Sequence, residues 1–111
     1  MICHAPPPHS VRVRSDHILL GTMCNVDRPD WTVLEEVVPK ESLAWFMWMC
    51  EVELEDGALV QVYKHRITRR YLHLADDGRA FYYIGGGCYR EVDRDLAAVA
   101  VFERSVPGRQ R

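Results

Sequence analysis

Apolar and polar residues alternate along the middle of the chain, between positions 44 and 54. The even-numbered positions there are mostly apolar, and three glutamates occupy alternate positions between 51 and 55. Because successive side chains of a strand point to opposite faces, this pattern predicts a long strand with one core-facing side. A helix from Pro39 onward is the rival interpretation. Asp56-Gly57, a usual two-residue hairpin turn between apolar runs, favours the strand.

A two-residue turn at this position also predicts how the two strands of the hairpin align. It places Val52 opposite Gln61 and Trp48 opposite His65, on the face expected to be the core side. The other face is expected to carry three apolar and two basic side chains: Trp45, Met47, Met49, Lys64 and Arg66.

A second hairpin is predicted from Tyr71 to Ala75 and from Arg79 to Ile84. Its loop, Asp76-Asp77-Gly78, suits a type I turn followed by a left-handed glycine. Gly85-Gly86-Gly87 is then expected to break the sheet. The pattern therefore predicts a meander of about four antiparallel strands.

Two short helices are predicted to flank the sheet. Asp30 can cap a helix over residues 31–38, which Pro39 would end. Asp93 can cap a second helix that reaches about Ser105. This second helix is expected to run through Leu96, Val99 and Phe102, although the β-branched residues there also suit a closing strand.

These elements predict an α+β domain with a four-stranded antiparallel meander and one or two flanking helices. If residues 93–105 form a strand instead, the alternative is a small barrel with an N-terminal helix. In that version the chain from Glu51 to Glu103 resembles SH3-like or Sm-like barrels, in which a turn such as Leu54-Glu55-Asp56-Gly57 recurs. The resemblance rests on common turn chemistry and transfers no function.

The domain is expected to span residues 11–106, with a disordered, proline-containing tail at 1–10 and a flexible C-terminus at 107–111. Val11 to Val13 and His17 to Leu20 are short β-like runs that suit an edge hairpin.

The composition of the 111-residue chain indicates one small domain without a strong electric field. Its formal net charge is −2, which by itself recruits neither nucleic acid nor an anionic membrane. The longest apolar run, residues 43–50, is too short to cross a bilayer, and the N-terminus lacks the features of a secretory signal. Four dispersed cysteines suggest reduced thiols. A cytoplasmic protein is therefore expected.

No motif in the sequence names a reaction or a cofactor. Cys50 and His65 would be loose diagonal neighbours with no third residue to orient the base. Cys3, His4 and His9 lack a fourth metal ligand at a recognisable spacing. The three-glycine run matches no phosphate-binding fingerprint. The sequence therefore predicts no enzyme, no metal site and no cofactor.

The prediction is a non-enzymatic protein-binding module, such as a small inhibitor or adaptor that self-associates. Aromatic, methionine and arginine side chains are enriched at interface centres, which makes the face from Trp45 to Arg66 the candidate surface. The alternative is single-stranded nucleic-acid binding, because basic groups neutralise phosphates and aromatic rings stack on bases. Its candidate residues are Lys64, Arg66, Arg69, Arg70, Tyr71 and Tyr83.

Overall fold

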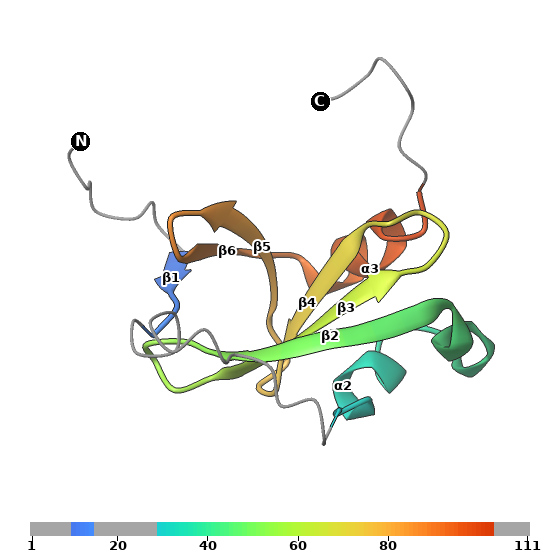
Figure 1. The fold of residues 1–111 in the computed structure, drawn as a ribbon, viewed down its shortest axis with the longest axis horizontal. Coiled ribbons are helices and arrows are strands. Elements are labelled where there is room, and N and C mark those ends of the chain that lie inside the picture. Colours follow the sequence, from blue (N-terminus) through green and yellow to red (C-terminus); the bar gives the residue numbers. More distant parts are fainter. Residues whose placement is uncertain (1–9, 15–28, 104–111) are drawn as a thin grey trace, which may run out of the picture.

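Six antiparallel strands form one sheet in the computed structural model, which describes residues 10–14 and 29–103 (Figure 1). The strands are β1 (Ser10–Arg12), β2 (Phe46–Glu53), β3 (Leu59–His65), β4 (Tyr71–Ala75), β5 (Ala80–Gly85) and β6 (Cys88–Val92). Their order across the sheet is β1-β6-β5-β4-β3-β2. The helices are α2 (Thr32–Glu35), the 3-10 helix η1 (Lys40–Trp45) and α3 (Arg94–Ala100).

The mostly antiparallel α+β fold is confirmed, but the sheet has six strands where four were predicted. The glycine run does not break the sheet. Gly85, Gly86 and Gly87 all have positive φ angles, and this conformation turns β5 directly into β6. β1 then pairs with β6 as an edge strand, with Val11 opposite Tyr89.

The alternative barrel is not found, because the six-stranded sheet has two separate ends at β1 and β2. A single bridge between Val13 and Leu54 joins one corner of these ends. Residues 94–100 form α3 and not a closing strand. The Asp93 carboxylate caps α3 as predicted, since it accepts a hydrogen bond from the Leu96 amide at 3.0 Å.

The first hairpin differs from its predicted alignment because its loop has an additional residue. The Leu54 amide donates to the Ala58 carbonyl at 2.9 Å, which closes a loop of residues 55–57. Gly57 occupies the left-handed region with φ 93°, as three-residue hairpin loops require. Val52 consequently pairs with Val60 and not with Gln61. A one-residue shift of this kind moves every side chain to the other face.

The prediction of one continuous apolar face along residues 44–54 is also wrong. Ala44 and Trp45 belong to η1, and a β-bulge at Met49 interrupts β2. Before the bulge, Trp48 packs on the side of α2; after it, Cys50 packs on the opposite side of the sheet. The extra residue of the bulge thus reverses the alternation halfway along the strand.

The sheet therefore has a core cluster on each face. The helices α2 and α3 cover one face. Leu34 of α2 and Ala97 of α3 pack there over Tyr63 and Leu72. The other face carries a cluster centred on β2, β3 and Phe81. The prediction that Leu96 and Val99 form the core-facing side of the last helix is wrong, because these residues are 69% and 62% exposed. Small alanines face the sheet and allow α3 to pack closely against β4 and β5.

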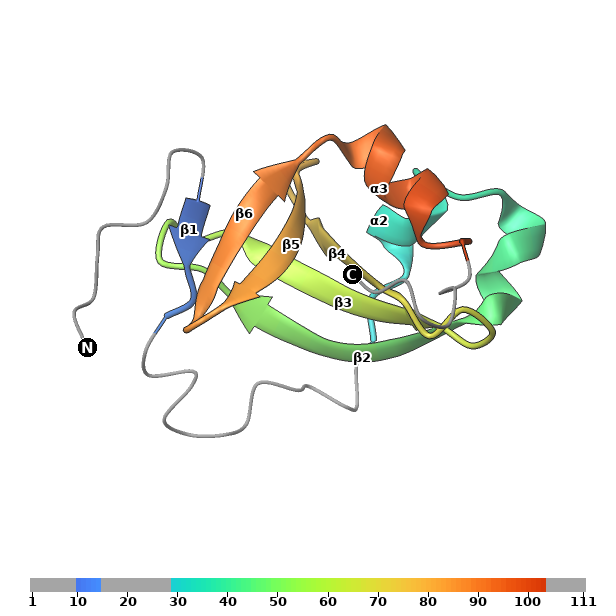
Figure 2. The same cartoon turned by 90° about the horizontal axis from the view of Figure 1, so that it is seen from above.

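The sheet is strongly curled. The β5–β6 hairpin rises away from β2 and β3 in Figure 1 and crosses over them in the view of Figure 2. Except for Ser10, the predicted N-terminal tail lies outside the described residues, as do 107–111 and His17 to Leu20. No helix within residues 10–14 and 29–103 is long and apolar enough to cross a membrane.

Candidate functional site

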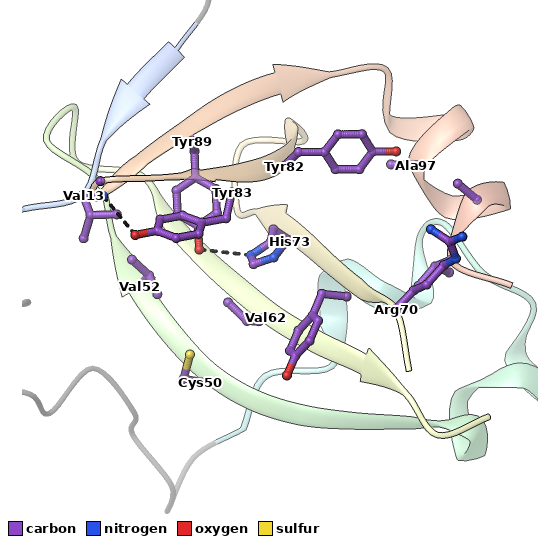
Figure 3. A pocket seen from close by; sticks show the side chains of 15 residues that line it. Val13, Cys50, Val52, Val62, Arg70, His73, Tyr82, Tyr83, Tyr89 and Ala97 are labelled. Atoms are coloured by element: carbon purple, nitrogen blue, oxygen red, sulfur yellow. Dashed lines mark hydrogen bonds between the residues drawn. The ribbon is translucent and has the colours of Figure 1, made fainter. Parts of the chain in front are cut away.

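A cavity opens where β4 and β5 separate. The two strands pair only through His73 with Phe81 and Leu74 with Ala80. Beyond these pairs β5 continues with β6, while β4 stays beside β3. The separation leaves a cavity of about 970 Å³ (Figure 3). This volume lies within the range of about 300–1,000 Å³ that small-molecule sites occupy.

Apolar side chains from β2, β3 and the residue after β1 form one wall of the cavity. Cys50 and Val52 come from β2, Val62 comes from β3, and Val13 follows β1 (Figure 3). Cys50 and Val52 share this face because strand side chains alternate. Val62 lies directly opposite Cys50 in the register. The result is a continuous apolar surface across the inner side of the sheet.

A histidine–tyrosine pair places polar atoms inside this apolar space. Nδ1 of His73 lies 3.0 Å from the hydroxyl of Tyr89 (Figure 3). Burial lowers the pKa of His73 to about 4. Burial also raises the pKa of the Tyr89 hydroxyl, with further contributions from Cys50 and Tyr83. Both groups are consequently uncharged at neutral pH and form a hydrogen-bonding pair without introducing a charge.

Aromatic rings surround this pair. The centroids of Tyr83 and His73 lie 5.2 Å and 5.0 Å from that of Tyr89. Tyr71 stacks with His73 at 6.1 Å. The Tyr83 hydroxyl accepts a hydrogen bond from the Gly87 amide at 2.9 Å, which fixes this tyrosine against the glycine turn. Aromatic faces of this kind can pack against flat or aliphatic ligands.

Two basic side chains lie at the end of the cavity that carries Tyr71. Arg70 lines the cavity itself, and its Nε donates to the Glu103 carbonyl at 2.5 Å. The Lys64 ammonium lies 5.3 Å from the ring centroid of Tyr71, which also lines the cavity. No Asp or Glu is present among the described residues that line the cavity. The charged side chains described at this end of the cavity are therefore basic, although the chain as a whole is slightly acidic.

The residues predicted to bind a partner lie along one edge and not on one continuous strand face. Trp45 ends η1 and is 49% exposed, and Met49 is the exposed bulge residue. Met47 pairs with Lys64, whereas the predicted two-residue turn would have placed it opposite Arg66. The Arg66 amide donates to the Trp45 carbonyl at 2.8 Å, so these two residues are neighbours.

The candidate nucleic-acid residues separate into two groups. Arg70, Tyr71 and Tyr83 line the cavity together. Arg66 and Arg69 lie instead in the turn between β3 and β4. Lys64 is close to the first group through its contact with Tyr71.

Cys50 and His65 are not diagonal neighbours on one face, because they pack on opposite faces of the sheet. Nδ1 of His65 accepts hydrogen bonds from the Ile67 and Thr68 amides at 3.1 and 3.2 Å. Burial lowers the pKa of His65, which is consistent with this accepting role. His65 therefore has a structural role, because it binds the backbone amides of the turn between β3 and β4.

No group of three or more metal-ligating side chains is found in the part of the chain that the structure describes. Cys3, His4 and His9, the sequence-derived metal candidates, lie outside that part.

No motif in the sequence pointed to His73, Tyr89 or the cavity itself. One signal was available: Tyr71, His73 and Ala75 alternate along β4 and share one face. Strand β6, which carries Tyr89, was not predicted, so nothing in the sequence indicated that Tyr89 meets His73.

Comparison with known proteins gave no match to a family model, to a curated protein or to a solved structure.

Proposed function

We propose that the protein binds an apolar small molecule in the cavity between β4 and β5. The observation that carries the proposal is a cavity of about 970 Å³ with a mostly aliphatic and tyrosine lining. Ligand sites typically combine such linings with a few placed polar groups. His73 and Tyr89 would supply these groups, because their hydrogen-bonded pair lies within the cavity.

The proposed binding gains its free energy from removing apolar ligand surface from water, at roughly 25 cal/mol per Å². The strands hold Cys50, Val52 and Val62 in place before a ligand arrives. A wall that is already formed lowers the ordering cost of binding. Binding without catalysis remains the prediction for this protein.

N-phenylnaphthylamine, a neutral aromatic probe that fluoresces in apolar surroundings, tests the proposal. Wild-type protein is expected to increase its fluorescence saturably with one site per chain. Val62→Phe places additional volume in the cavity wall and is expected to weaken binding at least about tenfold, since about 1.4 kcal/mol corresponds to a factor of ten.

Leu96→Phe is the matched control, because it adds a ring to a residue that is 69% exposed on α3. Its affinity is expected to equal that of wild type. Thermal unfolding checks that both variants fold. Equal binding by folded Val62→Phe, or no saturable binding by wild type, would overturn the proposal.

A second candidate function is protein binding by self-association through the edge that carries Trp45. The specific observation is that Trp45, Met49 and Ile67 are 49%, 36% and 47% exposed. Large apolar residues at a surface are enriched in interfaces. Arg66, hydrogen-bonded to the η1 backbone beside Trp45, would contribute a polar rim.

Sedimentation equilibrium over a range of concentrations tests this second candidate. A dimer is expected that dissociates in the double variant Trp45→Ala, Met47→Glu. Leu96→Ala, which shortens another exposed side chain on α3, is the control. A monomeric wild type at every concentration, or an unchanged dimer in the double variant, would contradict self-association.

A further inference from the structure

We infer that the ligand of this cavity is an anionic amphiphile, with an apolar or aromatic body and a carboxylate-like or sulfonate-like group held at Arg70. This inference rests on the proposed function and specifies the chemical class of the ligand. It follows from how the charged side chains are distributed around the cavity.

Three cations away from the cavity lining, Arg14, Arg79 and Arg94, have carboxylate partners. Arg79 forms ion pairs with Asp77 and Asp56 at 2.8 and 2.9 Å. Arg94 reaches Glu36 at 3.8 Å. These side chains have their charge compensated within the chain.

Arg70 and Lys64 have no carboxylate partner, and of the described cations without one Arg70 is the one that lines the cavity. Arg70 uses its Nε for a backbone carbonyl, and Lys64 lies over an aromatic ring; within residues 10–14 and 29–103 neither forms an ion pair. The cavity lining described above contains no acidic residue. An anionic group placed here would meet a guanidinium that has two Nη groups remaining for a forked hydrogen bond.

Arg70 is held in position by its surroundings. Its Nε donates to the Glu103 carbonyl at 2.5 Å, and its own amide donates to the Thr68 hydroxyl at 3.2 Å. Thr68 in turn donates to the Val101 carbonyl at 2.6 Å. These contacts tie the β3–β4 turn to the end of α3, so the guanidinium is placed at the cavity before any ligand binds.

The opposite end of the cavity fits the body of the ligand. Val13, Val52 and Tyr83 lie away from Arg70 and present apolar surface (Figure 3). His73 and Tyr89, between these two ends, are uncharged and therefore do not compete with Arg70 for the anion. An amphiphile with one charged end matches this distribution better than a neutral or cationic molecule.

The test compares two probes that differ only in charge. Anilinonaphthalene sulfonate carries the anionic group, and N-phenylnaphthylamine has the same rings without it. In wild type the sulfonate is expected to bind at least about tenfold more tightly than the neutral probe, as one charge-assisted hydrogen bond of about 1.5–3 kcal/mol implies.

Arg70→Gln is expected to remove this preference and leave the affinity for the neutral probe unchanged. Arg70→Lys retains the charge and is expected to restore part of the preference. Arg90→Gln, which removes an exposed charge on β6 away from the cavity lining, is the control and is expected to match wild type.

The outcomes separate the two proposals. If both probes bind equally to wild type and to Arg70→Gln, the anionic ligand is excluded and the proposed cavity function stands. If the neutral probe does not bind, the proposed function fails and the inference fails with it. Displacement of the sulfonate by a single-stranded oligonucleotide at low salt would overturn the inference in favour of nucleic-acid binding.

Discussion

The Tyr89 hydroxyl lies 3.0 Å from Nδ1 of His73, although β6 and β4 are not neighbours in the sheet. The contact passes across β5, and it is possible because the sheet curls toward its inner face (Figure 2). The pair therefore links the β5–β6 hairpin to the rest of the sheet, at the point where β4 and β5 separate. It belongs both to the fold and to the proposed site.

The stability of the protein is expected to fall in acid because of His73. Burial lowers its folded-state pKa from 6.5 to about 4. Above pH 6.5 the imidazole is neutral in both states and has no effect. Between 6.5 and 4 the unfolded chain binds a proton that the folded chain does not. The free energy of unfolding is therefore expected to fall by up to about 3 kcal/mol across this window and to level off below it.

Urea unfolding of wild type and His73→Gln at several pH values measures this effect. The difference in stability between the two proteins is expected to narrow as the pH falls from 6.5 to 4. His65, whose pKa is also lowered by burial, is present in both and cancels. Parallel pH profiles would show that His73 does not cause the acid sensitivity.

A chain of side-chain hydrogen bonds between β2 and β3 is expected to be important for stability. The Trp48 indole donates to Gln61 at 2.7 Å, and the Gln61 amide donates to Glu51 at 2.8 Å. Gln61 is only 2% exposed. Gln61→Leu removes the acceptor of the indole, so the free energy of unfolding is expected to fall by about 1–3 kcal/mol.

Adding Trp48→Phe to Gln61→Leu eliminates the unsatisfied indole and is expected to recover part of that loss. Denaturant unfolding of the two single variants and the double variant gives the coupling energy. Additive effects would mean that this hydrogen bond contributes nothing.

The cap of α3 provides a third prediction. The Asp93 carboxylate accepts from the Leu96 amide at 3.0 Å, and Asp93→Ala is expected to lower the free energy of unfolding by about 1 kcal/mol. Asp95→Ala removes an acid from the same first turn without removing that cap, and is expected to cost less. Thermal unfolding compares them, and an equal loss in both would mean that charge and not capping is responsible.

Arg69 provides a fourth prediction, because it is the described non-glycine residue with a positive φ, at 66°. The left-handed conformation costs a side-chained residue about 1–2 kcal/mol. Glycine relieves this strain, but it also raises the conformational entropy of the unfolded chain, which offsets part of the gain in stability. Arg69→Gly is thus expected to raise stability by up to about 1 kcal/mol. Arg66 does not have a positive φ, so Arg66→Gly is expected to lower the free energy of unfolding. If both variants lowered the free energy of unfolding, Arg69 would not be strained.

Local signals in the sequence predicted several elements correctly. Asp76-Asp77-Gly78 forms the second hairpin loop with Gly78 at φ 95°. Asp93 begins a helix, and Leu34 of the short helix α2 is fully buried. Each of these features depends on interactions between residues that are close together in the sequence, so a short stretch of sequence is enough to predict it.

Long-range features were not predictable in the same way. The bulge at Met49 and the additional loop residue beside Gly57 each shift a register by one position, and neither changes the apolar pattern that the sequence displays. The cavity depends on the separation of β4 from β5 and on the unpredicted strand β6. Its main polar pair, His73 with Tyr89, could therefore not be inferred from spacing.

Methyl NMR of the full chain with N-phenylnaphthylamine tests the central claim most directly. Val13, Val52 and Val62 line the cavity. Their methyl signals are expected to shift when the probe binds and to show nuclear Overhauser contacts with it. Leu34 and Val38, packed on the other face of the sheet, are expected to show none. Contacts confined to Leu96 and Val99 on the outer side of α3, with the cavity methyl signals unchanged, would contradict the account.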